Sequence, residues 1–149
     1  RPVTILGIGA LGAACGQALH QLGFPVTGWS RVAKDIPNIR CLHGGDGLTQ
    51  ALTGAQIVIL LLPQTPQTEN MLNAETLALL ARGAFVINPG RGPLIDDDAL
   101  VAALDSGQIA HATLDVFRTE PLPQNHPFWA HPQVTVTPPY PPPPLPHVT

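Results

Sequence analysis

The chain has few charged residues, two cysteines and no long apolar run, and each scarcity excludes a class of protein. Only 11% of its 149 residues are charged and the formal net charge is -3, so nothing favours binding to nucleic acid or to an anionic membrane. The longest apolar run, residues 57–63, is too short to span a bilayer, and no signal-peptide pattern opens the chain. We therefore expect a cytoplasmic protein with no nucleic-acid or membrane partner.

The two cysteines, Cys15 and Cys41, are too few for a disulfide framework or a set of metal ligands. We expect free, buried thiols in a reducing compartment and no metal site. The length fits one domain with a single sizeable core, and 44% hydrophobic residues indicate a globular chain whose strands are buried on both faces.

Short apolar runs alternate with amphipathic segments of helical length along most of the chain. The runs predict strands at residues 3–6, 26–29, 39–42, 57–62, 84–87, 112–116 and 134–137. The amphipathic segments predict helices at residues 11–22, 48–52, 74–81 and 97–104. Strands separated by helices imply right-handed βαβ crossovers. We therefore predict an α/β fold of the Rossmann type: a doubly wound, three-layer parallel sheet of about seven strands.

The composition changes after residue 137. Seven of the twelve residues from 138 to 149 are proline, which excludes a helix or an inner strand and predicts a polyproline II or disordered tail. The sequence thus divides into a folded domain at residues 1–137 and a proline-rich tail at residues 138–149.

A glycine-rich segment follows the first predicted strand and opens the first predicted helix. It reads Gly7-Ile8-Gly9-Ala10-Leu11-Gly12. The first glycine of this pattern permits a tight turn, the second lets a pyrophosphate approach the backbone, and the third lets helix and strand pack closely. Such glycines can also merely turn a loop, but their place in a βαβ unit favours an NAD(P)-binding site formed by Gly7, Gly9, Ala10, Leu11 and Gly12.

The end of the second predicted strand bears on which dinucleotide binds. It reads Trp29-Ser30-Arg31, with Lys34 three residues further on. An enzyme that prefers NAD places Asp or Glu here, whereas Ser30 can donate to a 2′-phosphate, Arg31 can pair with it and Lys34 adds positive charge. A solvated turn is the alternative. No acid lies between Trp29 and Lys34, which also argues against a Rossmann methyltransferase, so we predict that NADP(H) is preferred over NAD(H).

Two further segments place charged groups at the ends of predicted strands. One reads Asn88-Pro89-Gly90-Arg91-Gly92, and the other reads Leu114-Asp115-Val116-Phe117-Arg118-Thr119-Glu120-Pro121. Cationic and acidic groups at the ends of buried strands can bind and polarise a small charged substrate. A surface arginine in a glycine-rich turn and a solvated loop glutamate are the alternative interpretations.

Together these segments resemble the D-2-hydroxyacid dehydrogenase family, and within it the NADPH-dependent glyoxylate/hydroxypyruvate reductases. The resemblance runs from Val3 to Pro138 and also includes Leu61-Leu62-Pro63-Gln64-Thr65-Pro66-Gln67-Thr68, residues 100–107 and residues 134–138. It implies an oxidoreductase that reduces a small 2-oxoacid, glyoxylate or hydroxypyruvate, in a homodimeric parent protein.

The resemblance also implies roles for individual residues. Arg91 would bind the carboxylate and carbonyl of a 2-oxoacid and polarise the carbonyl, and Glu120 would hydrogen-bond a catalytic histidine and raise its pKa. Asp115 would accept a hydrogen bond from the nicotinamide carboxamide. Other members of the implied cofactor cleft are Trp29, Leu62, Pro63, Thr68, Pro89, Gly90 and Arg91 itself.

The chain departs from the family pattern in two ways. Pro139 replaces the histidine expected after Thr137-Pro138, and losing a positioned general acid typically lowers a rate by about 10²–10⁴-fold. The other candidate acids, His126, His131 and His147, are weak substitutes. The family also builds a substrate domain from segments before and after this core. We therefore expect the chain to bind NADPH better than it catalyses, with a non-catalytic nucleotide-binding or interaction module as the alternative.

The proline-rich tail has two explanations. Loss of one nucleotide in a histidine codon after Pro138 would turn GC-rich alanine codons into proline codons, which accounts for the missing histidine and the change of composition together. An evolved ligand for an aromatic groove is the alternative. We favour the frameshift, and reading the gene in its other forward frames separates the two.

Overall fold

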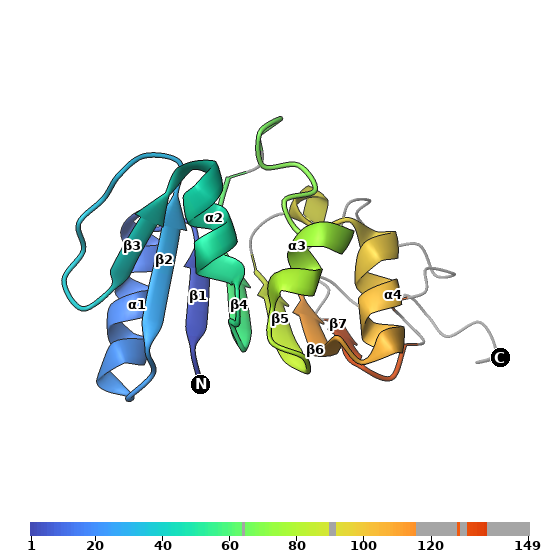
Figure 1. Ribbon diagram of the computed structural model, residues 1–149. Coiled ribbons are helices and arrows are strands. Elements are labelled where there is room, and N and C mark those ends of the chain that lie inside the picture. The colour runs from blue at the N-terminus through green and yellow to red at the C-terminus, as the bar shows by residue number, and fades with distance from the viewer. Residues whose placement is uncertain (64, 90–91, 116–127, 129–130, 137–149) are drawn as a thin grey trace, which may run out of the picture.

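A computed structural model describes residues 1–63, 65–89, 92–115, 128 and 131–136 of the protein. Seven strands of these residues form one sheet in the order β3-β2-β1-β4-β5-β6-β7, and every neighbouring pair is parallel (Figure 1). The strands are β1 (Val3–Leu6), β2 (Val26–Ser30), β3 (Arg40–His43), β4 (Ile57–Leu60), β5 (Ala84–Asn88), β6 (Ile109–Leu114) and β7 (Val134–Val136). This arrangement confirms the predicted parallel α/β sheet.

Helices cover both faces of the sheet. They are α1 (Ala10–Gln21), α2 (Gly44–Leu52), α3 (Ala74–Leu79) and α4 (Asp97–Ser106), with a short 3-10 helix η1 (Gly92–Leu94) before α4. In Figure 1, α2, α3 and α4 lie in front of the sheet and α1 lies behind β2 and β3. The predicted doubly wound, three-layer Rossmann architecture is therefore confirmed.

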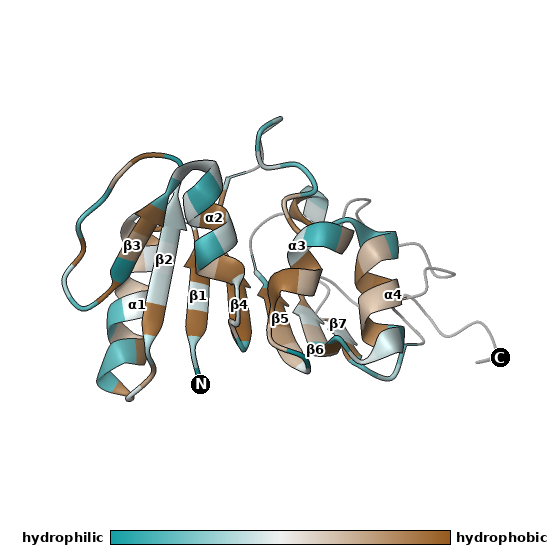
Figure 2. Cartoon of the chain, viewed as in Figure 1, coloured by the Kyte–Doolittle hydropathy of each residue, from teal (hydrophilic) through white to brown (hydrophobic). Residues whose placement is uncertain are grey.

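Each face of the sheet has its own apolar core, because successive side chains of a strand point to opposite faces. In β1, Ile5 belongs to the smaller cluster on the α1 side and Leu6 to the larger cluster under α2, α3 and α4, and both are fully buried. The central strands accordingly show little hydrophilic colour in Figure 2, whereas the connections after β2 and β4 mix hydrophilic and hydrophobic colours. Continuous apolar strands of this kind are typical of parallel sheets covered on both faces.

Two elements begin earlier than the sequence pattern predicts. Helix α2 begins at Gly44 rather than at residue 48, because its first turn is rich in glycine and so carries little helical signal. Strand β6 begins at Ile109 rather than at residue 112, because Gly107, with a φ of 84°, ends α4 in the left-handed conformation and the strand follows at once. Polar residues near both starts concealed them in the pattern.

The other element boundaries lie within three residues of the expected ones. Helix α4 begins as the sequence predicts, with Asp96 as its N-cap accepting from the Ala99 amide at 3.2 Å and two further aspartates in its first turn. The expected strand at 57–62 ends at Leu60, and α3 ends at Leu79 instead of residue 81. The predicted boundary between residues 137 and 138 lies outside the described residues and stays a prediction.

The described residues can be compared with the expectations on membrane-spanning helices, on groups of metal ligands and on disulfide bonds. None of their helices has the length and apolar character needed to cross a bilayer. The same residues contain no group of three or more His, Cys, Asp or Glu side chains placed to hold a metal ion. Cys15 and Cys41 are free thiols, as expected, but they are half-buried rather than fully buried.

Candidate cofactor site

A cavity of about 380 Å³ opens where the topology of the sheet reverses. Strand β1 leads outward through α1 to β2 on one side, whereas the chain returns through α2 to β4 on the other side. Ligands of open α/β sheets bind at such a switch point, outside the carboxyl ends of the strands. The described residues that line this cavity come from three segments: residues 7–9, Ser30 to Lys34 without Ala33, and a third group made of Leu61, Leu62, Pro63, Thr65 and Thr68.

The first wall of the cavity is the turn between β1 and α1. Gly7 has a φ of +103°, and a Cβ there would lie 2.7 Å from the Leu61 carbonyl carbon, so the turn requires glycine. A Cβ on Gly12 would overlap the Gly7 carbonyl oxygen, so the helix can approach the turn only without a side chain. A Cβ on Gly9 would meet nothing within 4 Å. The space above Gly9 is therefore open to a ligand.

The N-terminus of α1 adjoins this open space. Gly9 is its N-cap and has no side chain to satisfy the first amide groups of the helix, and no acidic residue stands in the first turn. Ala10 is exposed, and the Leu11 side chain is 70% exposed. Unsatisfied amides at a helix N-terminus bind phosphate groups, so this arrangement fits the pyrophosphate of a dinucleotide.

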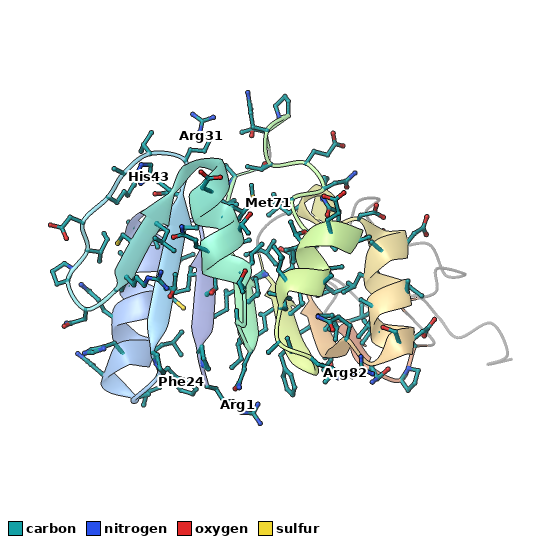
Figure 3. The ribbon with its side chains drawn as sticks, in the orientation of Figure 1. Arg1, Phe24, Arg31, His43, Met71 and Arg82 are labelled. Atoms are coloured by element: carbon teal, nitrogen blue, oxygen red, sulfur yellow. The ribbon has the colours of Figure 1, made fainter. Side chains whose placement is uncertain are left out.

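The second wall is the turn after β2. The Ser30 side chain is buried, and its hydroxyl donates to the Val32 carbonyl oxygen at 2.6 Å, which tightens the turn. Arg31 and Lys34 are exposed and line the cavity, while Asp35, the nearest acid, is not part of the lining. Figure 3 shows Arg31 at the edge of the sheet where the strands end, with its guanidinium directed to solvent. This wall is cationic.

Trp29 points away from the cavity. Its indole Nε1 donates to the Gly44 carbonyl oxygen at 2.8 Å, and its ring is buried in the core under α2. Neighbouring Gly28 faces the α1 side, where a Cβ would press on Ile8. The structure therefore gives Trp29 a contact between β2 and α2, and its predicted part in cofactor binding has no counterpart in the cavity lining.

The third wall is the turn that follows β4. It contributes Leu61, Leu62, Pro63, Thr65 and Thr68 to the lining. Leu62 and Thr68 are buried, and Pro63 is exposed at the rim. This wall combines apolar side chains with two hydroxyl groups.

The predicted substrate-binding residues lie partly outside the described residues. Gly90, Arg91 and Glu120 are among those that the structure does not describe, as are position 139, His126 and His147. The strands that precede Arg91 and Glu120 are neighbours: Asn88 at the end of β5 pairs with Leu114 at the end of β6.

Two other predicted cofactor residues flank this edge of the sheet. The Asp115 amide donates to the Asn88 carbonyl oxygen at 3.1 Å, which ties the ends of β5 and β6 together. Pro89 and Asp115 are both exposed, and neither lines the cavity. Their predicted contacts with the nicotinamide stay predictions.

His131, a described residue, lies at the opposite end of the sheet from the cavity. It precedes β7, so it lies at the edge where the strands begin, and its Nε2 lies 2.8 Å from the Asp105 carboxylate. The Gln133 amide donates to its Nδ1 at 3.1 Å. These contacts fasten the loop before β7 to α4, and they give His131 no place in proton transfer at the cavity.

The structure thus brings together eight predicted residues around one cavity: Gly7, Gly9, Ser30, Arg31, Lys34, Leu62, Pro63 and Thr68. It adds four that sequence reasoning did not single out: Ile8, Val32, Leu61 and Thr65. All four lie within segments in which other residues were predicted to bind the cofactor. Their apolar or short side chains carried no chemical signal of their own.

A Rossmann sheet with a glycine turn at its switch point defines a dinucleotide-binding domain. Over residues 1–139 the chain matches the family model for the NAD-binding domain of D-isomer specific 2-hydroxyacid dehydrogenases. The chain therefore belongs to this family of oxidoreductases and comprises its NAD-binding domain.

Individual relatives agree with this assignment. The chain is 49% identical over 136 residues to glyoxylate/hydroxypyruvate reductase A of Serratia proteamaculans, and the match covers 91% of this chain and 44% of the relative. The chain thus spans less than half the length of such curated relatives.

Solved structures show the same fold. A D-isomer specific 2-hydroxyacid dehydrogenase of Xanthobacter autotrophicus in complex with NADPH and MES is 51% identical, with a TM-score of 0.88 over 91% of this chain and 43% of that one. An NADPH-dependent glyoxylate/hydroxypyruvate reductase of Sinorhizobium meliloti in complex with NADP and sulfate is 37% identical, with a TM-score of 0.87 over 91% of this chain and 44% of that one.

Proposed function

We propose that this domain binds NADP(H) in preference to NAD(H) and serves a reductase of glyoxylate or hydroxypyruvate. The observation that carries the cofactor part is the second wall of the cavity, where Arg31 and Lys34 line the space and none of the described carboxylates does. A carboxylate at this position would bind ribose hydroxyls and repel a 2′-phosphate, whereas a guanidinium pairs with the phosphate. The substrate part is supported by the Serratia and Sinorhizobium relatives, which are glyoxylate/hydroxypyruvate reductases.

Ser30 supports this proposal through Arg31. Its hydroxyl has one proton, and that proton is donated to the Val32 carbonyl oxygen. This bond joins the residues before and after Arg31 and so fixes the backbone position from which the arginine side chain extends. In this arrangement the guanidinium, rather than the serine hydroxyl, is the principal donor to a 2′-phosphate.

The catalytic part of the proposal rests on Arg91, which lies outside the described residues, and on Asp115, which follows β6. When bound, the reduced nicotinamide supplies a hydride to the carbonyl carbon of the substrate. Arg91 would hold the substrate carboxylate and draw electron density toward the carbonyl oxygen, and Asp115 would accept from the carboxamide and orient the ring. Proton delivery to the forming alkoxide needs an acid, which Pro139 cannot provide.

Titration with the two nucleotides tests the cofactor preference. We expect the unmodified chain to bind NADPH more tightly than NADH, and Arg31→Ala to remove most of that difference, on the order of 1–3 kcal/mol for a charge-assisted contact. Arg40→Ala is the matched control, because Arg40 is an exposed arginine at the opposite edge of the sheet. Equal dissociation constants for NADPH and NADH in the unmodified chain would overturn the preference.

Steady-state NADPH oxidation tests the loss of the acid. We expect residues 1–149 to reduce glyoxylate negligibly even when saturated with NADPH, because no group at position 139 can transfer a proton. Turnover on the order of 1 s⁻¹ or more, which lies in the ordinary range of enzymes, would show that another group performs this step.

For the intact parent we further propose a homodimer that acts on a small 2-oxoacid in the cytoplasm. The family assignment supports the substrate class. Sedimentation of the full-length parent, with monomer as the contrary result, tests the assembly.

A further inference from the structure

The third wall of the cavity is held by the hydroxyl of Thr68. Thr68 is 2% exposed and is one of four buried polar residues in the part of the chain that the structure describes. Its Oγ1 accepts from the Thr65 amide at 2.8 Å and donates to the Pro63 carbonyl oxygen at 2.8 Å. Both partners line the cavity. One hydroxyl therefore bonds to two residues of the wall.

These bonds lie where the sheet no longer holds the chain. The last sheet-like bond of this segment runs from the Leu61 amide to the Leu6 carbonyl oxygen at 2.7 Å. Beyond it, Thr65 and Thr68 cap each other: the Thr68 amide donates to Thr65 Oγ1 at 3.3 Å while the Thr65 amide donates to Thr68 Oγ1. This reciprocal pattern is a capping box, which fixes the entry of the chain into a turn.

The Thr68 hydroxyl has no proton left for a ligand. A threonine hydroxyl carries one donor, and here that donor is directed to the Pro63 carbonyl oxygen. A hydrogen bond donated to a cofactor would release Pro63 from its place at the rim. The geometry is therefore that of a group that shapes the wall.

We propose that Thr68 is a positioning residue for the nucleotide cavity, acting through Pro63 and Thr65. The inference rests on the proposed NADP(H) binding. Removal of the hydroxyl leaves the Pro63 carbonyl and the Thr65 amide without their partner and frees this wall to move. Nucleotide affinity then falls because Pro63 and Thr65, which both line the cavity, lose the bonds that fix them.

The chain contains a matched control for this residue. Thr76 accepts from the Asn73 amide at 2.8 Å and donates to the Met71 carbonyl oxygen at 2.8 Å, so it makes the same two bonds at the same spacing. It belongs to the capping box that opens α3 and does not line the cavity. Thr76→Val therefore deletes equivalent bonds away from the site.

The experiment compares T68V, T68S and T76V with the unmodified chain by NADPH fluorescence titration and urea unfolding. We expect T68V to weaken NADPH binding about tenfold, the effect of roughly 1.4 kcal/mol lost with these bonds. We expect T68S, which keeps the hydroxyl, to bind NADPH as tightly as the unmodified chain does. T76V should leave the NADPH dissociation constant within about twofold of that of the unmodified chain. If T68V does not fold, T68A, which leaves room for a water to replace the hydroxyl, takes its place with a weaker effect in the same direction.

Three results would overturn the proposal: unchanged NADPH affinity in T68V or T68A, no recovery in T68S, or equal loss in T76V. Hydrogen exchange at the Thr65 amide separates this inference from the proposed function, because it needs no nucleotide. We expect T68V to accelerate exchange there and T76V not to do so. If the unmodified chain bound no NADPH while the Thr65 amide still depended on Thr68, the proposed function would fail and the role of Thr68 in shaping the turn would stand.

Discussion

Two walls of the cavity are built by opposite means. The turn between β1 and α1 depends on the absence of side chains: Gly7 and Gly12 face backbone atoms that a Cβ would strike. The turn after β4 depends on the presence of side chains, since the hydroxyls of Thr65 and Thr68 supply its internal bonds. Added atoms therefore damage the first wall, and deleted atoms damage the second.

Within the first wall, two glycines allow effects on protein stability to be separated from effects on ligand binding. Gly12 is enclosed by the Gly7 carbonyl and the Ile5 side chain, whereas Gly9 faces empty space. A methyl group at Gly12 disturbs the protein itself, while a methyl group at Gly9 disturbs only what enters the cavity. Substitution of the two glycines distinguishes packing from ligand approach in one short turn.

Gly12→Ala has the largest expected effect. The new Cβ would overlap the Gly7 carbonyl oxygen, which is backbone and cannot rotate aside, so α1 must move off the sheet. We expect a loss of about 3 kcal/mol or more in the free energy of unfolding, at the upper end of overpacking effects, measured by urea denaturation. A fully stable Gly12→Ala protein would show that the helix and the turn are not held in this close contact.

Gly9→Ala is the second test of the comparison. Gly9 has a φ of -77° and a ψ of -156°, which alanine adopts readily, and its Cβ would touch nothing within 4 Å. We expect less than about 1 kcal/mol of destabilisation, the scale of an N-cap change. NADPH affinity should nevertheless fall by about two orders of magnitude, because the Cβ occupies the path of the pyrophosphate to the backbone. Retained NADPH affinity would place the pyrophosphate elsewhere.

The glycine wall could be predicted from sequence because its signal is local. The spacing of Gly7, Gly9 and Gly12 between a strand and a helix specifies the turn, and the structure has the predicted turn. The cationic second wall was predicted for the same reason, since Arg31 follows directly on the end of β2 and Lys34 comes three residues later. Local patterns of this kind can be interpreted without knowledge of the tertiary structure.

The threonine wall could not be predicted in the same way. Resemblance placed Thr68 in the cofactor cleft, but the bonds to Pro63 and Thr65 depend on the conformation of the whole turn, which no spacing rule specifies. The early starts of α2 and β6 were missed because glycine and polar residues conceal periodicity there. Arg91 and Glu120 lie outside the described residues, so their roles stay predictions.

Trp29 shows that a side chain in a matched segment need not line the cavity. The resemblance placed it with Ser30 and Arg31, whereas alternation along β2 buries its ring under α2 while Gly28 turns toward α1. Its part in cofactor binding stays a prediction. The strand ends at the cavity, but only some of its last side chains can reach it. The sequence pattern locates the edge of the sheet better than it locates the face.

Trp29→Phe has the smallest expected effect and separates the two assignments of this residue. Phenylalanine keeps most of the apolar ring but removes the Nε1 donor to the Gly44 carbonyl oxygen, so we expect about 1 kcal/mol less stability against urea. NADPH affinity should stay within about twofold of the unmodified chain, because the ring lies in the core and not in the cavity. The opposite pattern, weakened NADPH binding with unchanged stability, would return Trp29 to the cofactor site. Arg31→Ala, measured in the same two assays, is the comparison, because Arg31 follows the same strand β2 but lies in the cationic wall. A change that acts through the core lowers stability, as we expect for Trp29→Phe. A change that acts through the cationic wall lowers NADPH affinity, as we expect for Arg31→Ala.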